Sequence, residues 1–127
     1  MSHFTRLRTR MTTKEYLTAA LADLDYAHTE GNEEVRGFGG QSTAVEIRVA
    51  TRSPGYDIGF RREGKVYECV ADWWGIHDVV QEDFLQKVSQ RYAYQATQAE
   101  LTRQGFAVAS EELEEDGRIR LVLRRMV

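Results

Sequence analysis

The sequence predicts an α+β fold, in which a single antiparallel β-sheet carries two α-helices packed on one face. Two segments, 12–24 and 82–104, have apolar residues at helical spacing, and most other segments alternate apolar and polar residues as strands do. Glycine-containing turns near residues 63–64 and 116–117 join consecutive strands as hairpins. The order of strand, helix, several strands, long helix and hairpin favours antiparallel pairing with both helices on one side.

The N-terminal part is expected to form a strand, a helix and two short strands. Residues 3–11 alternate in polarity, which places three arginines on one side of a strand: Arg6, Arg8 and Arg10. A helix follows over residues 12–24, and it begins with a threonine and a glutamate at the spacing of a capping box. Short strands are predicted to start near Tyr26 and, interrupted by glycines, within residues 33–40.

The remainder of the chain predicts a central strand, a hairpin, the long helix and a closing hairpin. Residues 43–51 form the clearest strand, and residues 56–72 form the first hairpin. The long helix spans residues 82–104 and is followed by Gly105, a residue suited to ending a helix. The expected core combines apolar residues of all these elements: Leu17, Leu21, Leu24, Val45, Ile47, Val49, Ile58, Phe60, Val88, Tyr92, Ile119, Leu121 and Leu123.

Length and composition indicate an ordinary cytoplasmic domain. The chain has 127 residues, 42% of them hydrophobic and 29% charged, and we treat residues 1–127 as one domain. No apolar run approaches the roughly 20 residues that a membrane span needs, and the N-terminus has no apolar signal core. The single cysteine, Cys69, excludes an internal disulfide. The net charge of −3 gives no global attraction to nucleic acid.

The segment VADWWGIHD, residues 70–78, holds both tryptophans of the chain. Adjacent side chains on a strand point to opposite faces, so we expect one indole to be buried near Tyr92 and the other to be exposed. Trp and Tyr dominate contact energies at protein interfaces. The sequence therefore predicts an aromatic patch for a partner or a flat ligand, formed by Trp73, Trp74, His77, Tyr92 and Tyr94. The alternative is that both indoles are structural.

Six arginines suggest a second candidate surface. If the first and last strands lie close together, they form one arginine face on the solvent side of the sheet: Arg6, Arg8, Arg10, Arg118, Arg120 and Arg124. A charged solvent face is expected on any half-covered sheet, and three acids on central strands could pair with these arginines: Glu46, Asp57 and Glu68. Arginines left unpaired would suit RNA, DNA or an acidic protein, although no aromatics are interleaved with them.

Residues for catalysis or metal binding are scarce. His77 and Asp78 are neighbours, but no serine or cysteine nucleophile stands in a motif near them. Cys69 lies on a predicted strand and is expected to be a buried, small apolar residue. The segment GFGG, residues 37–40, lacks the lysine of a phosphate-binding loop, so its glycines are expected to serve turns. We therefore predict no catalytic residues, no metal ligands and no cofactor.

Five segments in this order resemble a known family: MSHFT at the start, YDIGF (56–60), VADWWGI (70–76), QRYAY (90–94) and DGRIRLVLRR (116–125). The resemblance is to the hypothetical chloroplast open reading frame thirty-five family, found in plastids, cyanobacteria and other bacteria. The chain departs from the family pattern at Asp25, where the family has glycine, and at its C-terminus, which lacks the family's tryptophan. The resemblance implies no activity. It implies only a gene context of small accessory proteins, ferredoxin-like proteins and AAA+ ATPases.

Three functions fit these observations. The first is a non-enzymatic interaction protein that binds a protein partner, such as an AAA+ ATPase or a small accessory protein, through the aromatic patch, the arginine face or both. The second is binding of single-stranded RNA or DNA through the arginine face. The third is a small-molecule binding protein or enzyme with a pocket near Trp73 and Trp74. The solvent face of the sheet distinguishes the first two, because arginines paired with acids are poor phosphate ligands.

Overall fold

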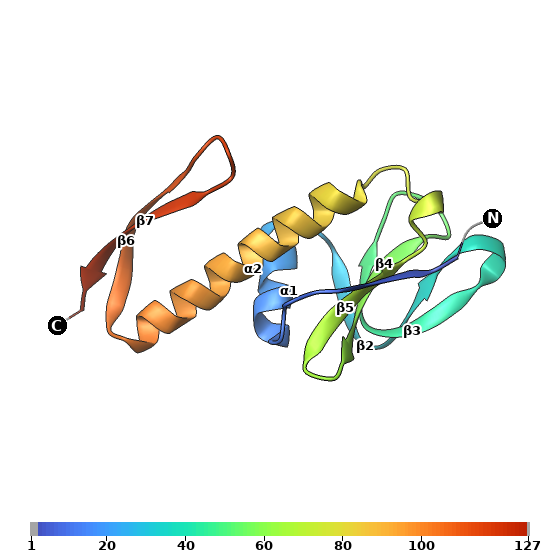
Figure 1. The fold of residues 1–127 in the computed structure, drawn as a ribbon, viewed down its shortest axis with the longest axis horizontal. Coiled ribbons are helices and arrows are strands. Elements are labelled where there is room, and N and C mark those ends of the chain that lie inside the picture. Colours follow the sequence, from blue (N-terminus) through green and yellow to red (C-terminus); the bar gives the residue numbers. More distant parts are fainter. Residues whose placement is uncertain (1–2, 127) are drawn as a thin grey trace.

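The computed structural model, which describes residues 3–126, confirms the α+β class. Its main sheet has five strands in the order β1-β5-β4-β3-β2, all antiparallel to their neighbours (Figure 1). The strands are β1 (Thr5–Arg8), β2 (His28–Arg36), β3 (Ser42–Ala50), β4 (Asp57–Glu63) and β5 (Val66–Ala71). The helices are α1 (Lys14–Asp23) and α2 (Gln81–Arg103).

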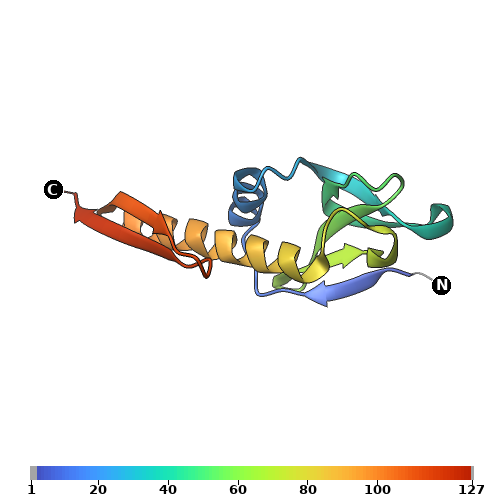
Figure 2. The ribbon, with the colours of Figure 1, turned by 90° about the horizontal axis from the view of Figure 1, so that it is seen from above.

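The last hairpin corrects the expectation of a single sheet. Its strands, β6 (Phe106–Leu113) and β7 (Ile119–Arg125), pair only with each other. The hairpin lies beside the C-terminal half of α2, away from the five-stranded sheet (Figures 1 and 2). Three residues expected in the main core therefore lie outside it: Ile119, Leu121 and Leu123. Among them, Leu123 is exposed.

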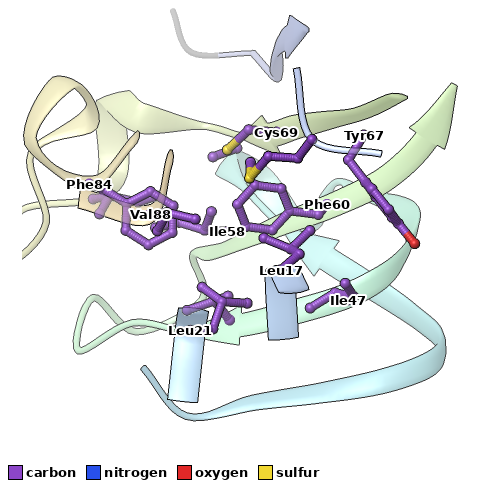
Figure 3. Close-up of a cluster of buried hydrophobic side chains, with 13 residues drawn as sticks. Leu17, Leu21, Ile47, Ile58, Phe60, Tyr67, Cys69, Phe84 and Val88 are labelled. Carbon is purple, nitrogen blue, oxygen red and sulfur yellow. The ribbon is translucent and has the colours of Figure 1, made fainter. Parts of the chain in front are cut away.

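One face of the main sheet carries both helices and the main hydrophobic core (Figure 3). Leu17 and Leu21 from α1 and Phe84 and Val88 from α2 are fully buried against the strands. The strands contribute Ile47, Val49, Ile58, Phe60, Tyr67, Cys69 and Ala71. Leu24 and Tyr92 are partly buried at the margin of this core. The core expected from helical and strand periodicity is thus confirmed for these elements.

The opposite face of the sheet, called the back face below, has a smaller cluster of its own. Val35 from β2 and Val45 from β3 pack on Val70 of β5, with Phe4 at the margin. Val45 was expected in the main core, beside Ile47. However, β3 pairs with β4 only from Ile47 onward, and β2 has a register shift between Glu30 and Glu33. The outer part of the β2–β3 hairpin consequently folds over the back face.

Two local features at the ends of α1 differ from the sequence expectation. The threonine before the helix makes no side-chain capping bond. Instead, the Tyr92 hydroxyl of α2 accepts hydrogen bonds from the amides of Thr12 and Thr13, at 3.0 and 2.9 Å. After the helix, Asp25 adopts a left-handed conformation with φ of 62°. This conformation favours glycine over residues that carry a Cβ.

Candidate functional site

The two tryptophans lie in a single 3₁₀ turn, η2 (Trp73–Gly75), which follows directly after β5. Trp73 is partly buried and its ring lies 6.1 Å from that of Phe84, measured between centroids. Trp74 is 63% exposed. The expected exposure of one indole is confirmed, whereas the other indole, expected to be buried, is only partly buried. The predicted neighbour of the inner ring was wrong, because it packs on Phe84 at the start of α2 and not on Tyr92.

The exposed indole has an aromatic partner from a distant part of the sequence. Phe38, in the 3₁₀ turn η1 (Phe38–Gly40) between β2 and β3, is 45% exposed. Its ring meets that of Trp74 edge to face, with centroids 5.8 Å apart and planes at 89°. We call Phe38 and Trp74 together the aromatic corner. Both turns lie at the end of the sheet where β1 begins (Figures 1 and 2).

Two buried carboxylates hold the backbone of η1 in place. Asp57 and Asp72 are each 1% exposed. They stand next to Ile58 and Ala71, which pair with each other across β4 and β5, so both acids belong to the back face. Asp72 Oδ2 accepts the Phe38 amide at 3.1 Å, and Asp57 Oδ2 accepts the Arg36 amide at 3.0 Å. The loop that carries Phe38 is therefore anchored to the central strands at two points.

Arg36 reinforces this anchor with its side chain. Its Nε and one terminal nitrogen donate to the two carboxylate oxygens of Asp57, at 2.9 and 3.1 Å. Burial alone would raise the pKa of Asp57, but the hydrogen bonds and charge of Arg36 outweigh it and hold that pKa below its ordinary value. Such two-point charge-assisted bonds are among the stronger polar contacts in proteins.

Glycine makes close packing possible on the other side of the corner. A Cβ added to Gly75 would lie 2.0 Å from Cε1 of Tyr56, so the Tyr56 ring rests directly on the backbone of η2. The chain beyond η2 is also fixed. Ser53 Oγ accepts the His77 amide at 2.9 Å and donates to Asp78 Oδ1 at 2.7 Å. Contacts with the buried aspartates, with Tyr56 and with Ser53 thus hold the backbone on both sides of Phe38 and Trp74.

Not all polar groups beneath the corner are satisfied. Within residues 3–126, Asp72 Oδ1 and Trp73 Nε1 are buried and have no hydrogen-bond partner. An unpaired buried polar group costs about 1–3 kcal/mol of stability. This local geometry is therefore not optimal for stability, although it does place Phe38 and Trp74 side by side.

The two tyrosines of the predicted aromatic patch, Tyr92 and Tyr94, lie elsewhere. Tyr92 sits between the helices, where its ring meets that of Tyr16 edge to face. Tyr94 is further along α2; its hydroxyl binds Glu111 of β6, and Arg91 lies over its ring at 4.0 Å. His77 is exposed in the loop after η2. The structure therefore assembles the corner from Trp74 and Phe38, and Tyr92 and Tyr94 do not join it.

The predicted arginine face is divided into two distant groups. Arg6 and Arg8 lie on β1, opposite Val70 and Glu68, with exposed Arg10 just beyond. The other three are on the separate hairpin: Arg118, Arg120 and Arg124. Among these, Arg118 and Arg120 pair with acids of the hairpin itself, namely Glu114 and Asp116.

The three central acids pair with other partners. Glu68 binds Arg61 at 2.7 Å, Asp57 binds Arg36, and Glu46 accepts the backbone amide of Arg62. In the described part of the chain, Arg6, Arg8 and Arg10 make no ion pair with an acidic side chain. A short basic strip on β1 is thus what remains of the predicted arginine face.

The described residues offer little for catalysis. Cys69 is fully buried, and burial raises the pKa of its thiol, which disfavours the reactive thiolate. Across residues 3–126 no three His, Cys, Asp or Glu side chains are grouped to hold a metal ion. In the same range no helix is long and apolar enough to cross a membrane. A hollow of about 480 Å³ lies over β2 and β3, and neither tryptophan lines it.

Sequence reasoning missed Phe38, Arg36 and the anchoring roles of Asp57 and Asp72. A signal was present for the acids, since each is a charged residue at the end of an otherwise apolar strand in YDIGF and VADWWGI. No signal in the sequence connects Phe38 with Trp74. They are brought together only because the β2–β3 hairpin folds over the back face.

The structure combines an α+β fold with an exposed aromatic corner whose backbone is held by buried polar contacts. The chain belongs to the family described as "Protein of unknown function (DUF1257)", whose model matches residues 20–122. It is 36% identical over 127 residues to the uncharacterized protein ycf35 of Cyanophora paradoxa, covering 98% of both chains. The uncharacterized ycf35 of Guillardia theta is 34% identical over 131 aligned positions, again covering 98% of each. No solved structure matches the chain.

Proposed function

We propose that this protein is a non-enzymatic interaction module that binds a protein partner through the aromatic corner of Phe38 and Trp74. The observation that carries the proposal is the exposure of Trp74, 63% of whose surface lies in solvent although it sits next to a buried core. Leaving a large apolar ring in water forgoes the free energy of its burial. An aromatic ring that stays exposed on a rigid backbone is typical of a binding hot spot.

The bracing of the corner supports the same function. The two aspartates, the Arg36 side chain and the close contact of Tyr56 with Gly75 fix both turns before any partner arrives. A surface that is already ordered loses less conformational entropy on binding, so more of the contact energy appears as affinity. Candidates for the partner, carried by the family resemblance alone, are an AAA+ ATPase and a small accessory protein.

The experiment compares partner capture by four immobilised proteins: the wild type, Trp74→Ala, Phe38→Ala and Val80→Ala. Val80 is the matched control, because it is 67% exposed and apolar but lies outside the corner. We expect one set of proteins from the native organism, quantified by mass spectrometry, to be retained by the wild type and the Val80 variant. The two corner variants should lose that set while melting within a few degrees of the wild type. Equal capture by all four proteins would refute the proposal.

A further inference from the structure

Strand β1 forms an open edge of the main sheet. It pairs with β5 on one side, and no described strand lies on its other side (Figures 1 and 2). The Thr9 amide donates to the Tyr67 carbonyl at 3.0 Å, so the N–H of Thr9 points toward β5. Because backbone groups alternate in direction along a strand, the N–H and C=O groups of Arg6 and Arg8 point toward the open edge. Such an edge can accept a further strand from another chain.

The side chains along this edge determine which strand would fit. Arg6 and Arg8 project from the back face and are exposed, and the acid opposite Arg8, Glu68, is already bound to Arg61 at 2.7 Å. Residues of an added strand that lie directly opposite Arg6 and Arg8 would share their face. Acidic side chains at these alternate positions would pair with the guanidinium groups of Arg6 and Arg8.

The positions between the acids face the helices. On β1 this side carries Thr5 and Leu7, and Leu7 packs against the main core. Apolar residues of an added strand would extend that contact. A second copy of this chain is a poor fit, because two β1 edges in antiparallel register would place arginine opposite arginine.

The open edge leads to the aromatic corner. Thr5 pairs with Ala71, and Asp72 and the η2 turn follow Ala71 directly. On the same side, the ring of Phe4 lies against Gly37, the residue before Phe38; a Cβ on Gly37 would be 2.9 Å from Phe4 Cζ. A strand added beside β1 would advance about 3.3 Å per residue toward this end of the sheet.

We propose that the partner presents an extended acidic segment, which adds to the β1 edge as a sixth strand and places an aromatic or large apolar side chain on the aromatic corner. This inference rests on the proposed function and specifies its ligand. Acidic side chains at every second position of the segment pair with Arg6 and Arg8, and apolar side chains between them cover Leu7. The aromatic or large apolar side chain contacts Trp74. Nucleic acid fits less well, because the alternating N–H and C=O groups of the edge match another peptide backbone, and Glu68 lies opposite Arg8 on the same face.

The test is selection from a displayed library of random ten-residue peptides on the full chain. Four targets are used: the wild type, Trp74→Ala, the double variant Arg6→Gln/Arg8→Gln and the charge-matched control Arg120→Gln/Arg124→Gln. We expect the wild type and the control to enrich peptides with acids two positions apart and an aromatic residue at one end. The β1 variant should lose the acidic preference alone, and Trp74→Ala should lose the aromatic preference alone.

The selected peptide then tests the backbone contacts. In fluorescence anisotropy, replacing its acids with glutamine should weaken binding to the wild type about tenfold or more, as expected for loss of close charge pairs. Arg8→Pro, which also removes an outward N–H, should bind more weakly than Arg8→Gln, while circular dichroism shows both folded. Equal binding by these two variants would overturn strand addition, and Arg6→Pro against Arg6→Gln repeats the comparison at a second site.

The outcomes separate the two proposals. Aromatic enrichment without acids would overturn the acidic strand and leave the corner as a binding site. Acidic enrichment that ignores Trp74 would support the strand and overturn the corner, whereas no enrichment at all would overturn both. Oligothymidylate that competes with the peptide and is lost in the Arg6→Gln/Arg8→Gln variant would assign the arginines to nucleic acid instead.

Discussion

Replacing Gly59 with alanine should destabilise the protein by about 1–3 kcal/mol, because the added methyl group has no room. Its Cβ would lie 2.3 Å from Cγ2 of Val35 and 2.7 Å from Cγ1 of Val45. Nonbonded carbon atoms pack at about 3.5–4.0 Å, so the hairpin would have to lift from the back face by more than about 1 Å. Both valines are buried against Val70, and neither can turn aside without opening that cluster.

Urea unfolding followed by circular dichroism measures the effect. The sharper assay is a double-mutant cycle, in which Val35→Ala removes the closest clashing atom. We expect Gly59→Ala and Val35→Ala together to cost less than the sum of the single changes, by about 1 kcal/mol or more. A Gly59→Ala protein as stable as the wild type, or strictly additive changes, would contradict the packing of the β2–β3 hairpin on the back face.

Three further predictions concern single residues. Asp25→Gly should raise stability by about 0.5–1 kcal/mol in thermal unfolding, because Asp25 has a left-handed backbone, and a lower melting temperature would contradict this. Asp57→Asn should be less stable than the wild type at neutral pH. Because the folded pKa of Asp57 lies below its unfolded value, this difference should shrink as pH falls below about 4, and a constant difference would contradict the ion pair. Trp73→Ala should cost about 3–5 kcal/mol in urea unfolding and Trp73→Phe much less, because phenylalanine keeps the contact with Phe84 and removes the unpaired indole N–H; equal losses would contradict that contact.

The sequence predicted the elements well and the position of the last hairpin poorly. Alternation at Ile119, Leu121 and Leu123 identifies an apolar face, but it does not identify what covers that face. The long helix has 23 residues and therefore spans about 34 Å, which carries the end of the chain past the sheet. The hairpin then packs beside the distal half of α2, where Ile119 and Leu121 line a small hollow with Ala93.

The candidate site was predicted in part for a similar reason. Local alternation is enough to separate Trp73 from Trp74, because it depends only on neighbouring residues. The pairing of Trp74 with Phe38 depends on a register shift in β2 and on the space left above Gly59. Neither appears in a period-two pattern, since a bulge alters which side chains share a face. The prediction of one arginine face was wrong because it required the first and last strands to lie in the same sheet.

The most direct test of the account is the affinity of the captured partner for the Trp74→Ala protein, measured by titration calorimetry beside its free energy of unfolding. Trp74 is mostly exposed, so its loss should change stability by less than about 1.5 kcal/mol, the upper range for one aromatic pair. As a hot-spot residue it should contribute about 2 kcal/mol or more to binding, which corresponds to roughly thirtyfold weaker affinity. A Trp74→Ala protein that binds the partner as tightly as the wild type would contradict the aromatic corner as the binding site.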